Sequence, residues 1–474
     1  MDGSNELTFR DVTELVTAKL NTYLSTSRTG MSRVVDMRPM NEISADLGLS
    51  HFLKNGGMDL DALSAFLDTY LQDSMHMHHP AFIGHQVAVP HIASAVADLL
   101  HGTINNPTSI FEMGPSAATI ENKLIHWMLE KFGWHEGAGV FTHGGSMANI
   151  HAMLAARASI APQAWKNGNP GNLVVLAPDN SHYSIARAIS ILGLGHESIV
   201  TIPTDRYERI VPDDIPKIIE VERTKGRQIM AVVANVGATS TGLYDPIKEI
   251  GECCQAYDCW LHLDSPHGAS AILSEKYRSF LEGIELADSL IWDAHKMMQT
   301  STLSTAVLFK QQKHLAHTFE QKGSYLFYEK ENLGVDSLPY QLECTKAPLA
   351  TKLFLTLAMT GEKGMGDFVT TLYDKTRTLA RHIDQCDGFS VEMPVESNII
   401  CFRYQPEQFD QLLLREALIK DGHYYITTTE IHGVRHLRIV VMNTLTDLAI
   451  IQGLLKEIEQ VSQGSLQNEP EYGE

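Results

Sequence analysis

Hydrophobic side chains follow two different patterns along the chain. In residues 1 to about 75 they recur at helical intervals, as at Leu60, Leu63 and Leu67. Asp59 precedes this run and is a suitable N-cap for a helix. We therefore expect an N-terminal helical arm. Such an arm seldom folds alone, so we expect it to pack on a larger body, either its own or that of a partner subunit.

From residue 138 onward, short apolar strands alternate with helical segments. The expected strands are GVFTH, NLVVLAP, QIMAVVANV, CWLHLD, SLIWD and TAVLF. Strands separated by helices predict crossover connections and a mostly parallel sheet covered on both faces. Ligands of such sheets bind beyond the carboxyl ends of the strands, and the polar motifs of this chain lie there. After residue 312 helices mix with strands such as NIICFRY and LRIVVMN, which indicates an α+β end lobe.

Composition limits the classes of protein that this pattern can represent. The 474 residues are enough for two or three lobes, and 44% hydrophobic with 20% charged content is typical of a globular protein. A net charge of -20 argues against nucleic acid or an anionic membrane as a partner. Six cysteines without a CxxC pair argue against a disulfide framework or a zinc site. No apolar run reaches transmembrane length and the N-terminus does not resemble a signal peptide, so we expect a cytoplasmic protein.

The segment MHMHHPAFIGHQVAVP carries four histidines. Their irregular spacing and the break at Pro80 argue against a metal cluster, and we expect no bound metal. We interpret this segment as a loop in which Phe82 lines a pocket.

A lysine lies just past one of the predicted buried strands. The strand, residues 289 to 292, continues into Asp293, Ala294, His295 and Lys296. Burial favours the neutral form of an amine, and a neutral amine attacks carbonyl groups, such as the aldehyde of pyridoxal phosphate (PLP). A surface lysine that opens a loop is the simpler interpretation of these residues alone.

Three further motifs each allow two interpretations. The turn around Gly145 and Ser146 suits a phosphate at a helix N-terminus, although many turns have this composition. His182 could stack on an aromatic ring or lie at a helix cap. Asp264, at the end of a buried strand, could pair with a protonated pyridine nitrogen or cap the following turn. Together with the lysine, these motifs supply the four groups that PLP uses.

In this order the motifs resemble those of the group II PLP-dependent amino-acid decarboxylases, which include aromatic amino-acid, glutamate and histidine decarboxylases. The resemblance runs from about Pro80 to Thr446, through HPAFIG, FEMGPSAATIENKLIHWM, GVFTHGGSMANIHAMLAAR, SHYSIARAISILGLG, NVGATSTGLYDPI, WLHLDSPHG, ADSLIWDAHK and LRIVVMN. It implies the aspartate-aminotransferase fold (fold type I) with a mostly parallel seven-stranded sheet, and a homodimer that shares its active site. We predict an arm over residues 1–85, a large PLP-binding domain over 86–360 and a small domain over 361–474.

The resemblance also implies which residues hold the cofactor. Lys296 binds PLP covalently as the internal aldimine, and His295 lies near the phosphate. Gly145 and Ser146 bind the phosphate through the backbone and the hydroxyl group. Thr239 matches a threonine close to the cofactor.

Further residues are implied to act on the ring and the substrate. His182 stacks on the ring, and Asp264 pairs with the pyridine nitrogen. Arg438 matches an arginine that can hold a substrate carboxylate, a task that suits a bidentate guanidinium.

The implied reaction is that of a carboxy-lyase of amino-acid metabolism. An L-amino acid loses CO2 through an external aldimine and a quinonoid, and protonation at Cα gives the amine. The family often uses a tyrosine on a mobile loop as the general acid. Tyr328 is our candidate here, and Tyr325 and Tyr340 are alternatives.

Some residues depart from the family pattern. Pro266 and His267 follow the aspartate where small and aromatic residues are usual, so we expect a titratable histidine in contact with the substrate. The segment ECTKAP, residues 343 to 348, lacks two arginines common in the family. These departures keep open an aldehyde synthase, which couples decarboxylation to oxidative deamination, or another PLP lyase. A catalytically silent homologue is a third possibility.

Overall fold

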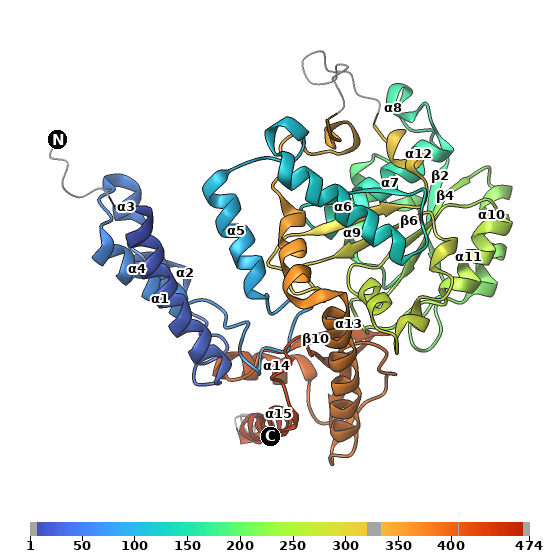
Figure 1. The fold of residues 1–474 in the computed structure, drawn as a ribbon. Coiled ribbons are helices and arrows are strands. Elements are labelled where there is room, and N and C mark those ends of the chain that lie inside the picture. The colour runs from blue at the N-terminus through green and yellow to red at the C-terminus, as the bar shows by residue number, and fades with distance from the viewer. Residues whose placement is uncertain (1–6, 320–332, 406, 468–474) are drawn as a thin grey trace.

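The computed structural model describes residues 7–319, 333–405 and 407–467 (Figure 1). Its N-terminal helices stand beside the main body as an arm, as expected from their hydrophobic pattern. These helices are α1 (Phe9–Arg28), α2 (Met40–Asp46), α3 (Leu49–Asn55) and α4 (Leu60–Gln72). The predicted N-cap Asp59 accepts a hydrogen bond from the Ala62 N–H at 2.9 Å. Lys19 on α1 forms an ion pair with Asp68 on α4 at 2.6 Å, which joins the two long helices of the arm.

A seven-stranded sheet forms the centre of the body. Its strand order is β1-β7-β6-β5-β4-β2-β3, and β7 runs antiparallel to both of its neighbours while the other pairs are parallel. The strands are β1 (Ala138–Thr142), β2 (Leu173–Pro178), β3 (Ile199–Ile202), β4 (Gln228–Asn235), β5 (Leu261–Asp264), β6 (Ser289–Asp293) and β7 (Thr305–Phe309). The mostly parallel sheet is therefore confirmed. The edge strand β3 is too short and too exposed to stand out in the hydrophobic pattern.

Helices cover both faces of this sheet (Figure 1). They include α6 (Pro115–Lys131), α7 (Gly145–Ile160), α9 (Tyr183–Ile191), α10 (Ile215–Thr224), α11 (Ile247–Ala256) and α12 (Gln312–Ala316). Two further helices pack on other helices, namely α5 (Ile92–Ile104) on α13 (Leu349–Asp384) and α8 (Ala164–Asn167) on α7. Alternation along β2 shows the two faces, because Val175 packs with α7 and α9 whereas Val174 and Leu176 pack with α6, α10 and α11.

The C-terminal part forms a second, antiparallel sheet in the order β10-β11-β9-β8. Its elements are α13 (Leu349–Asp384), β8 (Phe389–Ser390), β9 (Ile399–Tyr404), α14 (Gln411–Asp421), β10 (Thr427–Ile431), β11 (Val434–Val440) and α15 (Leu448–Gln467). Gly361 breaks α13 into two helices with φ 71° and ψ 164°, a backbone conformation that favours glycine. The predicted domain boundaries stay a prediction.

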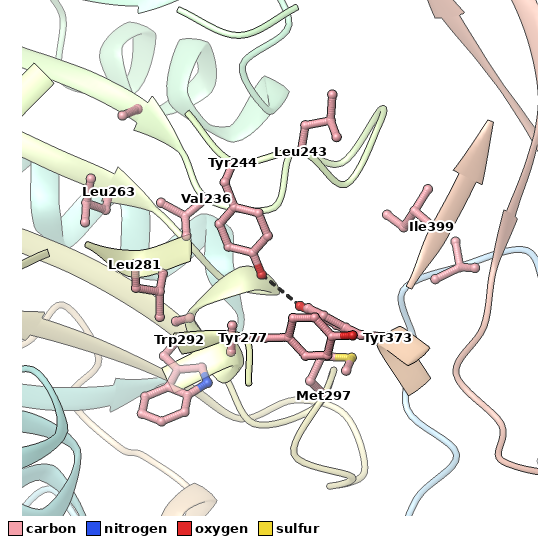
Figure 2. Packing of buried hydrophobic residues seen from close by; sticks show 14 of the residues in the cluster. Val236, Leu243, Tyr244, Leu263, Tyr277, Leu281, Trp292, Met297, Tyr373 and Ile399 are labelled. Carbon is pink, nitrogen blue, oxygen red and sulfur yellow. Dashed lines mark hydrogen bonds between the residues drawn. The ribbon is translucent and has the colours of Figure 1, made fainter. Parts of the chain in front are cut away.

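The core beneath the sheet joins α13 to the central body (Figure 2). The Tyr244 hydroxyl donates to the Gly268 carbonyl at 3.2 Å and accepts from the Tyr373 hydroxyl at 2.8 Å. Met297 is fully buried in the same cluster. Because Met297 follows Lys296 directly, its burial anchors the turn that carries this lysine. In the part of the chain that is described, no helix has the length and hydropathy needed to cross a bilayer.

Candidate active site

Lys296 lies in a tight turn just beyond β6. Trp292 before it and Met297 after it are fully buried, so the turn has little freedom. The Lys296 side chain is 18% exposed, and its Nζ is 3.4 Å from Asp293 Oδ2. His295 Nε2 is also 3.4 Å from this oxygen. This burial argues against a solvated surface lysine, and the described residues hold the amine by one loose ionic contact.

Asp264 ends β5 and is 5% exposed. In the described residues its side chain has one hydrogen-bond donor, Asn149 Nδ2, at 3.4 Å from Oδ1. Burial raises the pKa of the Asp264 carboxyl to about 6, although the Asn149 hydrogen bond and the charge of Lys296 both oppose the rise. No residue of the following turn caps this carboxylate among those described. Oδ2 is therefore available for an external donor, as the protonated nitrogen of PLP would be.

His182 is the N-cap of α9, so the capping interpretation is confirmed. Its Nδ1 accepts from the Ser184 N–H at 3.3 Å and lies 2.7 Å from the Ser184 hydroxyl. Burial and the charge of Lys296 lower the pKa of His182 to about 4, which keeps the ring neutral. Capping uses only one ring nitrogen, and the ring is still close enough to Lys296 and Asp293 to feel both charges. The cap and a stacking role are thus compatible.

The glycine turn after β1 offers an anion site beside the lysine turn. Gly144 has φ 98°, a conformation that favours glycine, and α7 begins at the next residue. Among the described residues, the N–H groups of Gly145 and Ser146 have no acceptor. A Cβ on Gly145 would be only 3.6 Å from Asp293 Oδ1, so the start of α7 lies against the lysine turn. Free N–H groups at a helix N-terminus fit the phosphate of PLP.

Arg438 on β11 is a buried guanidinium, 5% exposed. Its Nη1 donates to the Gly84 carbonyl and to Thr427 Oγ1, both at 3.1 Å. Its Nε is buried without a hydrogen-bond partner, and no carboxylate of the described residues pairs with it. A buried cation without an anion is costly, so this edge of the guanidinium suits the carboxylate of a bound molecule.

His267 differs from what the sequence suggested, and Phe82 is enclosed by other side chains. His267 is buried, and its Nε2–H donates to Asn398 Oδ1 at 2.6 Å. Burial lowers the pKa of His267 to about 3, so it does not titrate near neutral pH. Phe82 is 1% exposed and stacks on Tyr425 with ring centres 5.6 Å apart. Val34, Ala81 and Tyr425 are among the residues packed around the ring, and a substrate-binding role for Phe82 stays a prediction.

The remaining candidates are less closely connected to the lysine turn. Thr239 is exposed in the turn before Gly242, and its role stays a prediction. Tyr328 and Tyr325 lie outside the described residues. Tyr340 lines a cavity of about 660 Å³ between α6, β1 and α12.

Sequence reasoning missed two polar residues that complete this region. Asn149 is the donor to Asp264, and Asp293 is the carboxylate beside Lys296. Both belong to motifs that the sequence analysis quotes. What marks both residues is that they are polar at positions that helix or strand packing buries. This burial becomes evident only after the elements have packed together.

Comparison with known proteins agrees with this arrangement. The pyridoxal-dependent decarboxylase conserved domain matches residues 63–405. The human acidic amino acid decarboxylase GADL1 is 30% identical over 448 residues, which cover 90% of this chain and 86% of that protein. The L-2,4-diaminobutyrate decarboxylase of Acinetobacter baumannii is 28% identical over 422 residues, covering 84% and 82%. The crystal structure of mouse CSAD has a TM-score of 0.86 at 24% identity, covering 96% of this chain and 99% of that one.

The chain belongs to the pyridoxal-dependent decarboxylase family. Its cofactor is PLP, and it is a carboxy-lyase of the amino-acid decarboxylase class. The family, the fold and the cofactor predicted from the sequence are thereby confirmed.

Proposed function

We propose that this chain removes the α-carboxylate of an L-amino acid as CO2 and releases the corresponding amine. One observation carries the proposal: Asp264 ends β5 and Lys296 lies just past the neighbouring parallel strand β6, while hydrogen bonds of Asn149 and Ser184 connect Asp264 to His182. An amine, an anion and a flat neutral ring therefore share one buried region. When bound, PLP supplies the electron sink that accepts the electrons left behind by CO2.

Each of several side chains would hold a different part of this cofactor. Lys296 would provide the amine for covalent attachment, and Asp264 Oδ2 would accept a hydrogen bond from the protonated ring nitrogen. His182 lies against the ring as a neutral imidazole. The free N–H groups of Gly145 and Ser146 hold the phosphate, and His295 and Thr239 lie beside the cofactor.

Two side chains serve the substrate in this proposal. Arg438 binds a substrate carboxylate through its unpaired Nε edge, which orients the amino acid. Tyr328 is the proposed proton donor to Cα. His267 remains uncharged, and its buried Nδ1 has no hydrogen-bond donor among the described residues.

Trapping and product analysis test the function together. Purified protein is loaded with PLP, reduced with borohydride and digested, and mass spectrometry should locate the cofactor on Lys296. The loaded enzyme is then supplied with single amino acids while CO2, amine, ammonia and peroxide are measured. CO2 and amine in equal amounts are expected. Ammonia and peroxide beside CO2 would instead indicate an aldehyde synthase, and bound PLP without turnover on any amino acid would indicate a silent homologue.

We also propose an acidic amino acid as the substrate. His85 Nε2 lies 3.1 Å from the Tyr425 hydroxyl, and the charges of Arg438 and Arg415 both act on His85. Neither arginine pairs with a carboxylate of the described residues, so a second acid group on the substrate would find cations here. The human relative is named for acidic amino acids, which supports this choice. Turnover of L-2,4-diaminobutyrate in preference to L-aspartate, L-glutamate and L-cysteine sulfinate would reject it.

A homodimer with a shared active site is the proposed assembly. Its support is a set of exposed apolar side chains on α5: Ile92, Val96, Leu99, Leu100 and Ile104. Light scattering of the purified protein should give twice the mass of 52.6 kDa. A monomer that is fully active at the same concentration would contradict the proposal.

A further inference from the structure

A line of buried polar side chains lies behind Asp264. It comprises Trp260, Ser289, His262, Asn149 and Ser184, all of them largely removed from solvent. They come from β5 and the residue before it, β6, α7 and α9, so the line crosses the sheet and the two helices above it. The cofactor contacts proposed above use none of these five residues directly.

The direction of each hydrogen bond follows from Asp264. Because its carboxylate only accepts, the Asn149 amide must turn its NH2 group toward Asp264, which leaves Asn149 Oδ1 facing His262 Nε2 at 2.9 Å. His262 Nε2 therefore carries the proton and donates. Burial lowers the pKa of His262 to about 3, so the ring is neutral and its Nδ1 accepts from the Ser289 hydroxyl at 2.9 Å. The Trp260 indole N–H completes the line by donating to Ser289 Oγ at 2.9 Å.

A second branch leads from the same amide to His182. Asn149 Nδ2 donates to Ser184 Oγ at 2.9 Å, so the Ser184 hydroxyl proton is free to point toward His182 Nδ1 at 2.7 Å. His182 Nδ1 also accepts the Ser184 N–H. The ring nitrogen Nδ1 thus accepts two hydrogen bonds, so the proton of the neutral imidazole is on Nε2.

We propose that Asn149 and His262 are positioning residues that orient Asp264 and His182 together for the cofactor ring. The inference rests on the proposed function, because it takes these two side chains as the cofactor contacts. The single Asn149 amide occupies Oδ1 of Asp264 and leaves Oδ2 for the ring nitrogen. The same amide, through Ser184, selects the His182 tautomer. His262 holds the amide in this orientation, since it donates to Oδ1, the one carbonyl oxygen of the Asn149 side chain.

The orientation explains why a histidine stands in the middle of a buried strand. A neutral histidine can donate at one nitrogen and accept at the other, so it links Ser289 to Asn149 without a charge. Leucine at this position would pack equally well but would leave Asn149 Oδ1 unsatisfied and the amide free to turn over. An inverted amide would direct its oxygen at the Asp264 carboxylate, which repels it.

Four variants and one control test the proposal in the PLP-free and PLP-loaded protein. Asn149→Leu and His262→Leu break the line, whereas His262→Gln keeps a donor toward Asn149 and an acceptor toward Ser289. Ser184→Ala removes only the branch to His182, and it is the mildest change should Asn149→Leu fail to fold. The control is His151→Leu, because His151 is fully buried on the same helix and, among the described residues, hydrogen-bonds only to the Met147 carbonyl and the Leu342 N–H.

The readouts are the PLP dissociation constant, the absorption spectrum of the bound cofactor, the thermal midpoint of the PLP-free protein, kcat and KM. We expect Asn149→Leu and His262→Leu to raise the PLP dissociation constant roughly tenfold or more and to shift the absorption band. Each should also lower kcat more than it raises KM. Ser184→Ala should act in the same direction by a few fold, and His262→Gln should recover most of the loss. His151→Leu should change only the thermal midpoint.

The result would differ if the line of buried polar side chains only stabilised the fold. The thermal midpoint would then fall in Asn149→Leu, His262→Leu and Ser184→Ala, while PLP affinity and the absorption band stay at the wild-type values. That outcome would overturn the proposal, as would a His262→Gln variant that binds PLP no better than His262→Leu. Failure of the proposed function is recognised separately, because wild-type protein would then bind PLP without releasing CO2 while the affinity series still reports on positioning.

Discussion

Two lysines show what distinguishes a structural charge from a reactive one in this molecule. Lys346 is 0% exposed, and its Nζ is held by Glu121 Oε1 at 2.5 Å and by the Phe141 carbonyl at 3.2 Å. Lys296 is more exposed, at 18%, and its nearest carboxylate is 3.4 Å away. The more deeply buried amine is therefore the less available one. Burial alone does not mark the reactive group, whereas a buried group with a loose or missing partner does.

The same difference separates the two regions around these lysines. At Lys346, the Glu121 oxygen that binds the ammonium also accepts the Phe141 N–H at 3.1 Å, so the pair ties α6 to β1. Around Lys296, Asp264 has one distant donor and the Arg438 Nε has no partner among the described residues. In the first region the Lys346 ammonium is paired within the chain, although Glu121 Oε2 is buried without a partner among the described residues. The second region leaves positions for a cofactor and a substrate.

The largest effect is expected at Lys296. Lys296→Ala should lower decarboxylation on the order of a thousandfold or more, because the amine for covalent attachment is lost. Borohydride should no longer fix the cofactor to the protein. The thermal midpoint of the PLP-free protein should change little, since this amine makes no tight contact. Retention of borohydride-stable PLP in the variant would show that another residue carries the cofactor.

Lys346 should show the opposite pattern. Lys346→Met should lower the free energy of unfolding by about 3–5 kcal/mol, because Glu121 is left as an unpaired buried charge. The shift is measured by urea unfolding, and activity per folded molecule should stay close to wild type. The double variant Lys346→Met with Glu121→Gln should recover much of the loss. An equal loss in the single and double variants would contradict the paired-charge explanation.

The stability difference between wild type and Asp264→Asn should depend on pH. The pKa of Asp264 in the folded protein, about 6, lies above its ordinary 3.8, so the folded state binds this proton more tightly than the unfolded state. The contribution of Asp264 to stability is therefore present at low pH and is lost as pH rises from about 4 through 6. Asparagine does not ionise, so Asp264→Asn should not lose this stability as the pH rises. In PLP-free protein, the free energy of unfolding of the variant should therefore increase relative to wild type by up to about 3 kcal/mol across this range. A difference in thermal midpoint that is constant with pH would contradict the assignment.

The smallest effect is expected from a conservative change at Arg438. Arg438→Lys keeps the charge but loses the Nε edge, so kcat/KM should fall roughly tenfold, mostly through KM. PLP affinity should be unchanged, because the guanidinium serves the substrate. An Arg438→Lys enzyme with wild-type KM and weaker PLP binding would indicate that this arginine binds the cofactor and not the substrate.

Local pattern alone determined much of this protein. Strand and helix alternation predicted the sheet, and polar residues at or just past apolar strands made Asp264 and Lys296 candidates, because both signals lie within a few neighbouring residues. The local residues left each candidate with two interpretations, and the resemblance to a known family favoured the functional one. The roles assigned to the candidate residues stay predictions, and Tyr328 lies outside the described part of the chain.

Only the tertiary structure decided which polar groups have partners. Asn149 meets Asp264 across 115 positions of sequence, and Lys346 meets Glu121 across 225. The enclosure of Phe82 and the unpaired Nε of Arg438 likewise depend on elements that lie far apart in the chain. Hydrophobic periodicity states which face of an element is buried, but hydrogen bonding inside the core depends on distances and directions that exist only after the elements have packed together.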